Sequence, residues 1–369
     1  MTVTVGATVV SSALDGGTAS ALEPAAAATA PTTPPAPPAC DRPAPTTAAG
    51  YQAMFDAKND DTWSGGDQAA SVRLPDGRVL WLFADTVRGG VRPGGSRAAG
   101  SVMVHNSLLV QASGCLTAVP AAREVIPNAP SGEWYWPTDA VVQGSRLLVF
   151  CSRVRGTSLT DFTSTGVDVA LFDLAAGAPR FQRMVGTAWS RTPETQPQFG
   201  KAFARDGGWL YTWSSRKVAG AFGKAVSVAR VQVAEALDPR AWRYWTGSAW
   251  SSRADRAVEV VHAVRGWSTS FSVYRSQGQW RALAKVDDVW GTDVVAATAA
   301  SPTGPFAATV VGRAPSGQPQ VQYTALAHPE LPLAGGSLLV SVCRNSLDLG
   351  EVWRDADLYK PQFSAVAAG

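Results

Sequence analysis

The sequence predicts an all-β fold, a five-bladed β-propeller, for the residues from about 50 to the C-terminus. Three observations support this. Beyond residue 50 the chain consists of short apolar runs separated by Gly, Pro, Asp and Asn turns, as strands and their connections do. No long stretch keeps an apolar period of 3.6, and the best helical candidate is a short one near Val233 to Leu237. One strand-turn-strand unit also recurs along the chain.

This repeating unit is a strand, a Gly-containing turn and a more apolar strand that ends in a polar residue. The copies span 67–86, 138–153, 200–216, 269–287 and 323–345. Each copy is followed by another predicted strand pair, which gives five units of ~64 residues, and a four-stranded sheet repeated radially is a propeller blade. A pair of β-sandwiches is the competing architecture.

The N-terminal segment differs in composition from the rest. Residues 1–30 are rich in Ala, Val, Thr and Ser, although Asp15 and Glu23 and the lack of a basic start make a weak export signal. A Pro/Thr/Ala-rich tract follows, which stays extended and cannot pack. We therefore expect a leader at 1–30, a linker at 31–50 and one propeller domain at 51–369, in a protein that is secreted or associated with the cell wall.

The composition limits the kinds of binding partner that we expect. Charged residues make up 17% of the chain, the net charge is +3, and the arginines are scattered, so no nucleic-acid footprint is present. No apolar run after the N-terminus is long enough to span a membrane. With three His and no CxxC motif we expect no zinc site and no cofactor, although a structural cation in the channel stays open. We expect a monomer.

The four cysteines allow three disulfide pairings. Cys151 and Cys343 lie inside apolar runs, which is typical of buried thiols. Cys40 and Cys115 lie in loop-like segments. The pattern favours a Cys40–Cys115 bridge.

The first hairpin carries the most specific chemical signal. Asp67 and Asp85 each lie nine residues from Asp76, in the turn Pro75-Asp76-Gly77. An antiparallel hairpin folded at that turn places the two aspartates opposite each other within one residue of register. Two carboxylates at one mouth of the propeller channel would suit glycoside hydrolysis, with one as acid and the other as nucleophile or base. The alternative is that both cap strand ends or bind turn amides.

Polar residues occupy equivalent points in the other units and could line a pocket, or could be ordinary hydrophilic strand ends. They are Asp139, Lys201, Ser270 and Tyr323 at the first strands, and Arg153, Arg216, Lys285 and Asn345 at the returns. Next to Asp139, an aromatic cluster (134–136) includes Trp136. Such rings stack on sugars, although core packing is equally compatible.

Several catalytic motifs are absent from the sequence, including GxGxxG, the P-loop and the GxSxG elbow. Residues 346–353 nearly match the Asp-box turn of sialidase propellers, with Val352 where Thr is usual. In sialidases that box is a structural turn, and the Arg cluster and Tyr–Glu pair of such enzymes are not found.

The hairpin segment WSGGDQAASVRLPDGRVLWLFADTVRG resembles a family of secreted, mostly actinobacterial propellers formerly labelled a domain of unknown function, which includes endo-D-arabinanases. HNSLLV (105–110), the Trp136-Pro137 pair, SPTGPF (301–306), HPEL (328–331) and the closing CRNS…LYKPQF extend the resemblance over residues 60 to 364.

The resemblance implies that Asp67 and Asp85 are the catalytic carboxylates. It implies substrate-side positions at Asp139, His328 and Asn345, to which the polar and aromatic positions above add Tyr323 and Trp136. Two departures occur: Ala84 stands where the family usually has Gly, and Cys343-Arg344 where it often has Tyr-Asn. The second puts specificity for D-arabinan in doubt.

The expected function is therefore that of an exported glycoside hydrolase acting on a furanoside-rich polysaccharide, with D-arabinan as the expected substrate. The alternative is a non-catalytic propeller that binds cell-wall glycan or a protein partner. Arginine salt bridges that lock both aspartates would favour this alternative. The sugar, endo or exo action and the stereochemical outcome stay open.

Overall fold

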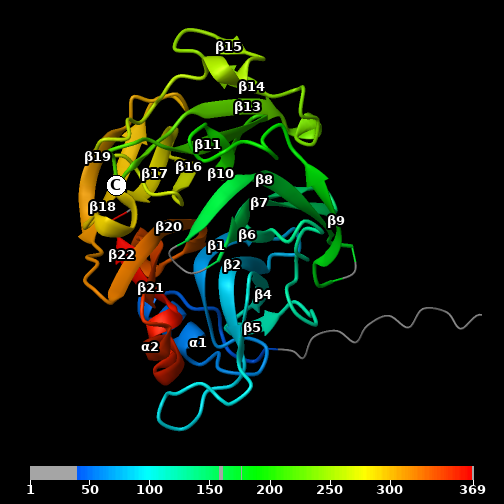
Figure 1. The fold of residues 1–369 in the computed structure, drawn as a ribbon, viewed down its shortest axis with the longest axis vertical. Coiled ribbons are helices and arrows are strands. Elements are labelled where there is room, and N and C mark those ends of the chain that lie inside the picture. The colour runs from blue at the N-terminus through cyan, green and yellow to red at the C-terminus, as the bar shows by residue number, and fades with distance from the viewer. Residues whose placement is uncertain (1–39, 158–160, 176, 368–369) are drawn as a thin grey trace, which may run out of the picture. The chain divides into compact units, whose positions relative to one another are not determined.

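The computed structural model describes residues 40–157, 161–175 and 177–367. The predicted leader at 1–30 and most of the linker lie outside the described residues. The described strands form five antiparallel sheets (Figure 1). These sheets are the blades of a propeller, so the predicted fold class is confirmed.

Each blade follows the chain order from its innermost strand outward. Blade 1 contains β1 (Gly65–Arg73), β2 (Val79–Arg88), β4 (Ser107–Ala112) and β5 (Cys115–Ala118), with β3 (Val102–Val104) also paired to β2. Blade 2 contains β6 (Trp134–Gln143), β7 (Arg146–Gly156), β8 (Phe162–Asp173) and β9 (Arg180–Gly186). Blade 3 contains β10 (Gln198–Asp206), β11 (Trp209–Lys217), β13 (Val228–Gln232), β14 (Arg243–Trp245) and β15 (Trp250–Ser251), with β12 (Lys224–Ala225) paired to β11. Blade 4 contains β16 (Ser272–Ser276), β17 (Gln279–Lys285), β18 (Asp293–Ala299) and β19 (Ala307–Arg313). Blade 5 contains β20 (Gln320–Pro332), β21 (Leu338–Ser346) and β22 (Pro361–Val366).

The innermost strands form a closed ring in the order β1, β6, β10, β16, β20 and back to β1 (Figure 1). Neighbouring strands of the ring run parallel, because successive residues of β6 contact positions of β10 that follow each other in the same chain direction. The Thr138 hydroxyl donates to the Gly200 carbonyl at 2.6 Å, and the Phe203 amide donates to Asp139 at 2.7 Å. All first strands therefore begin, and all second strands end, on one side of the ring. We call this side the mouth face.

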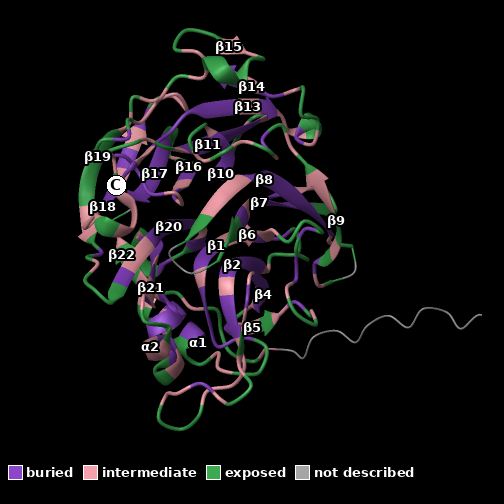
Figure 2. Cartoon of the chain, viewed as in Figure 1, coloured by how far each residue is buried: buried purple, intermediate pink, exposed green. Residues whose placement is uncertain are grey.

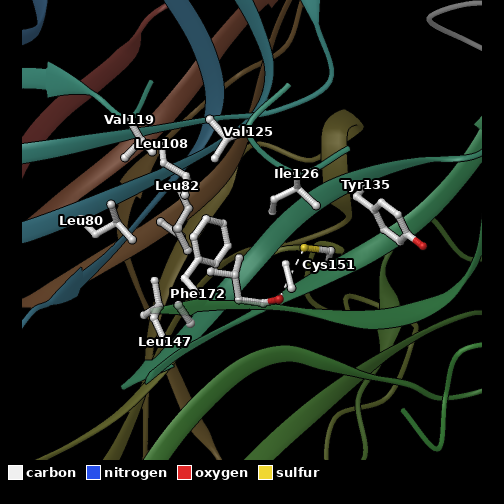
Figure 3. Close-up of a cluster of buried hydrophobic side chains, with 14 of the residues drawn as sticks. Leu80, Leu82, Leu108, Val119, Val125, Ile126, Tyr135, Leu147, Cys151 and Phe172 are labelled. Carbon is white, nitrogen blue, oxygen red and sulfur yellow. Dashed lines mark hydrogen bonds between the residues drawn. The ribbon is translucent and has the colours of Figure 1, made fainter. Parts of the chain in front are cut away.

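The apolar core lies in layers between adjacent blades. Figure 3 shows one layer, where Leu80 and Leu82 of β2 and Leu108 of β4 pack against Leu147 of β7 and Phe172 of β8. Further clusters fill the other four seams. Figure 2 shows the resulting gradient, with buried inner strands and an outer strand such as β19 largely exposed. Burial of apolar surface between blades is thus what holds the ring together.

Helix α1 (Ala48–Asp56) seals the seam between blades 5 and 1. Its buried Phe55 contacts Trp63, Trp81 and Phe363 with ring centroids 5.0–5.9 Å apart. The Gln52 side chain accepts a hydrogen bond from the Phe363 amide at 2.9 Å, as a neighbouring strand would. The helix thus covers the outer strand of the three-stranded blade 5.

The predicted Cys40–Cys115 bridge is confirmed, with Cα atoms 5.8 Å apart, and Cys151 and Cys343 are buried free thiols. The bridge ties residue 40 to β5, and α1 begins at Ala48. Residues 40–50, which we expected in the linker, therefore belong to the packed domain.

The helical elements differ from expectation. Helix α1 was not predicted, and the candidate at 233–237 is a 3₁₀ turn, η1 (Val233–Glu235). The Asp-box-like stretch contains α2 (Leu349–Arg354), which Asp348 caps by accepting from the Gly350 amide. The remaining 3₁₀ turns are η2 (Ala254–Arg256), η3 (Asp288–Trp290), η4 (Ala334–Gly336) and η5 (Ala356–Tyr359). Within the described chain, no helix is long and apolar enough to cross a bilayer.

Candidate active site

The first hairpin brings Asp67 and Asp85 together on the mouth face. Gly66 pairs with Thr86 and Gln68 with Phe83, so Asp67 faces the step from Ala84 to Asp85. A β-bulge at this point holds Gln68 (φ 76°) and Ala69 (φ 55°) in the left-handed region, where side chains other than glycine are strained. The hairpin register derived from the turn is therefore correct to within one residue.

Asp67 lies in a setting that favours its protonated form. Burial, and next the charge of Asp85, raise the pKa of Asp67 to about 7. Its Oδ2 accepts a hydrogen bond from the Tyr323 hydroxyl at 2.7 Å, which acts in the opposite direction. Its Oδ1 is buried and has no hydrogen-bond partner among the described residues. One oxygen is thus fixed by a hydrogen bond, and the other is buried without a partner in the described part of the chain.

Blade 5 supplies the groups around Asp67. Asn345 Nδ2 donates to the Tyr323 hydroxyl at 3.2 Å, and Tyr323 passes the bond on to Asp67. The Tyr359 hydroxyl of η5 donates to the Asp85 carbonyl at 3.0 Å and also lowers the pKa of Asp67. Burial raises the pKa of both tyrosines well above 10, so they stay protonated donors.

Asp85 contacts one side chain of blade 2 and one from the connection between β3 and β4 of blade 1. Its Oδ1 accepts a hydrogen bond from Trp136 Nε1 at 2.8 Å and lies 3.1 Å from His105 Nδ1. His105 stacks on Trp134 with centroids 4.6 Å apart. Within the described residues, neither Asp67 nor Asp85 forms a salt bridge with an arginine or lysine.

Gln68 links three inner strands across the ring. Its Nε2 donates to the Thr138 carbonyl of β6 at 3.0 Å, and its Oε1 accepts from the Ser270 hydroxyl, just before β16, at 3.0 Å. The side chain is 6% exposed. The residue next to Asp67 thereby anchors the bulge to blades 2 and 4.

Asp139 is bound to backbone rather than directed at the carboxylate pair. Its Oδ1 accepts from the Ala140 amide and its Oδ2 from the Phe203 amide, both at 2.7 Å. Burial raises the pKa of Asp139 to about 7, and the charge that affects it is that of Glu330. Asp139 therefore joins β6 to β10.

His328 is enclosed between blades 1 and 5. It is 0% exposed, with Nδ1 2.5 Å from the Ser71 hydroxyl and Nε2 2.8 Å from the Ser341 hydroxyl. Burial lowers its pKa to about 3, so the ring is neutral. It lies five positions beyond Tyr323 on β20, roughly 16 Å along the strand. The structure thus groups five of the seven predicted site residues, Asp67, Asp85, Trp136, Tyr323 and Asn345, and leaves Asp139 and His328 elsewhere.

Residues 49–368 match the model of the family described as Domain of unknown function (DUF5005). The chain belongs to this family. A search of curated proteins finds no match.

Two solved structures show the same fold. A Bacteroides ovatus protein described as a candidate hydrolase superposes with a TM-score of 0.70 at 20% identity, over 86% of this chain and 89% of that one. The GH43_1 enzyme from Xanthomonas citri, solved in complex with xylose, gives a TM-score of 0.50 at 14% identity, over 87% of this chain and 94% of that one. At these identities the likeness establishes the propeller architecture.

Three residues of this candidate site were not predicted as site residues: Gln68, His105 and Tyr359. All three lie in segments that carry the family resemblance (the first hairpin, HNSLLV and LYKPQF), which is the signal that could have found them. Their contacts with Asp85 and Asp67 are tertiary, and no spacing in the sequence reveals them.

The other polar positions of the units are paired separately. Lys201 donates to the Ser152 hydroxyl at 2.6 Å, and burial lowers its pKa to about 8. Lys285 donates to the Val289 carbonyl at 2.7 Å, and burial lowers its pKa to about 8 as well. Arg216 forms an ion pair with Glu259. The side chains of these residues thus form hydrogen bonds or ion pairs within the protein.

Proposed function

We propose that this DUF5005 protein hydrolyses glycosidic bonds of a polysaccharide, with Asp67 as general acid and Asp85 as base or nucleophile. The observation that carries the proposal is the unequal setting of two neighbouring carboxylates that have no arginine or lysine partner in the described chain. Two carboxyl groups whose surroundings differ can serve as acid and base in one reaction.

The hydrogen bonds support this assignment of the two roles. A carboxyl group with a pKa of about 7 keeps a proton near neutral pH, and the unpartnered Oδ1 of Asp67 can donate it to the leaving oxygen. Tyr323 fixes the other oxygen. Asp85 accepts from Trp136 and is oriented by it, as a base or nucleophile must be.

Exposed aromatic side chains on the mouth face support a polysaccharide substrate. Phe162 begins β8 and is 46% exposed, Phe222 follows β11 and is 65% exposed, and Trp290 follows β17 and is 50% exposed. All three therefore lie on the same side of the ring as Asp85, and aromatic rings stack on the C–H faces of sugars. We extend the proposal to a furanoside-rich substrate of the arabinan type and to an extracellular location. The sequence resemblance is the support for both.

The test is hydrolysis by Asp67→Asn and Asp85→Asn variants, with Asp76→Asn, at the far turn of the same hairpin, as the matched control. Purified proteins are incubated with arabinan, arabinogalactan and xylan, and the products are resolved by chromatography. We expect each site variant to lose about 10²–10⁴-fold in rate and to keep the thermal midpoint, while the control stays active. Wild-type rates in both site variants would disprove the catalytic pair. Glycan binding without hydrolysis by the wild type would establish the non-catalytic alternative.

A further inference from the structure

A concave site lies on the mouth face, beside blade 2. This pocket has a volume of about 410 Å³ and is bounded by the end of β7, the start of β8 and the segment around residue 190. Its lining is dominated by cationic and hydroxyl side chains: Arg153, Arg155, Arg191, Thr163, Ser164 and Ser190. Glu133 is the acidic residue of the lining.

Glu133 is already neutralised by its neighbours. Its Oε2 accepts from Arg153 Nε at 2.9 Å, and its Oε1 accepts from the Thr165 hydroxyl at 3.0 Å. Against the effect of burial, the hydrogen bonds from Ser131, Arg153 and Thr165 and the charge of Arg153 hold the pKa of Glu133 below its usual value. Glu133 and Arg153 therefore form an ion pair, and Arg153 also lies 3.9 Å from a second carboxylate, that of Asp168.

The two other guanidinium groups of the pocket are unpaired. Arg155 and Arg191 are exposed, and within the described chain neither side chain forms a hydrogen bond or an ion pair. Arginine is the side chain that best matches carboxylate and phosphate, because its planar fork donates two parallel hydrogen bonds. Two uncompensated guanidinium groups and adjacent hydroxyls in one pocket therefore fit an anionic group.

The pocket is connected to the carboxylate pair through two aromatic rings. Thr163 of the lining follows Phe162, whose ring packs edge-on against Trp136 at 4.9 Å. Trp136 in turn donates to Asp85. A glycan bound across Asp67 and Asp85 and continuing over Phe162 would bring its next units to the pocket.

We propose that this pocket is a subsite for an acidic substituent of the glycan, a carboxylate or a phosphate, bound by Arg155 and Arg191. The inference rests on the proposed function for its place in the reaction. The binding of an acidic sugar can nevertheless be measured without turnover.

The experiment is calorimetric titration of the full-length Asp67→Asn variant with glucuronate, glucose 6-phosphate and glucose. The same titrations are made after adding Arg155→Gln, Arg191→Gln or both, and Arg146→Gln serves as control because it is an exposed arginine at the opposite end of β7. We expect at least one acidic sugar to bind more tightly than glucose. Each pocket substitution should weaken that binding about tenfold, and the control should leave it unchanged.

The titrations with glucuronate and with glucose 6-phosphate distinguish a carboxylate site from a phosphate site. Equal affinity for glucose and both acidic sugars, or acidic-sugar binding that survives the double pocket substitution, would overturn the proposal. Because the titrations use a variant that lacks the proposed acid, a failure of hydrolysis in the wild type leaves this result independent.

Discussion

The acidity of Asp67 is set by three kinds of contact. Burial and the charge of Asp85 raise its pKa, while the hydroxyl groups of Tyr323 and Tyr359 lower it. The balance leaves a carboxyl group that titrates close to neutral pH. A proton donor with a pKa near the working pH is the most effective general acid.

This balance predicts the pH dependence of hydrolysis. Because Asp67 must be protonated to act as acid and its pKa is raised to about 7, kcat/KM should fall as the pH rises through about 7. The Tyr323→Phe substitution removes a donor to the ionised form, which raises the pKa further and moves the falling limb to higher pH. Rates measured from pH 4 to 9 check both statements, with Tyr274→Phe on β16 as control. A limb that stays in place in Tyr323→Phe would contradict the assignment of Asp67.

The sequence allowed the carboxylate pair to be predicted because one local feature, the Pro75-Asp76-Gly77 turn, determines the register of the hairpin. Trp136 shows the limit of such reasoning. Its aromatic character predicted a sugar platform, but its indole N–H is engaged with Asp85, and only the packing of blade 2 against blade 1 brings the two together.

At the scale of elements, bulges in the inner strands connect the blades. β1, β6, β10 and β20 each break register near the mouth face. An extra residue in a strand frees a polar group from the ladder and redirects it. In β6 the Thr138 hydroxyl at the bulge reaches the Gly200 carbonyl of the next blade, and Asp139 receives an amide from β10.

Asp139→Ala tests this structural role. The substitution leaves the Phe203 amide without its acceptor, so we expect a loss of about 1–3 kcal/mol in the free energy of unfolding. The KM for glycan should not change, because Asp139 is engaged with backbone. Urea denaturation and initial rates measure the two effects, with Asp238→Ala, whose carboxylate accepts an exposed backbone amide, as control. An increase in KM at unchanged stability would restore the substrate-binding role that the sequence suggested.

Helix α1 shows why one element escaped prediction. It has nine residues, it contains Gly50, and it follows a Pro/Thr/Ala-rich tract, so its local propensity is weak. Its stability comes from burying Tyr51, Met54 and Phe55 in the seam between blades 5 and 1. That seam forms from segments about 300 residues apart in the sequence, so no local sequence pattern predicts it.

At the scale of the whole molecule, the Cys40–Cys115 bridge fixes the start of the domain to blade 1. It closes a loop over a sequence separation of 75 residues. For a loop of this length the chain-entropy model gives about 4.5 kcal/mol, and measured values are commonly 2–4 kcal/mol.

We therefore expect Cys115→Ser to lower the free energy of unfolding by about 2–4 kcal/mol. Reduction of the wild type with dithiothreitol should produce the same loss, and the variant should not respond to dithiothreitol. Urea denaturation with and without the reductant measures this. Equal stability of the reduced and oxidised wild type would show that the packing of α1 suffices to hold the seam.

The seam between blades 5 and 1 also bears on the stage of synthesis at which the proposed activity could arise. Asp67 and Asp85 come from the first blade, but the hydroxyl that contacts Asp67 belongs to Tyr323, 256 residues later. A nascent chain on the ribosome that has emerged only as far as blade 4 already carries both aspartates, yet it lacks the tyrosines that tune Asp67. Under the proposed function, hydrolysis would then begin only after blade 5 has emerged, and the appearance of activity would mark the closure of the ring.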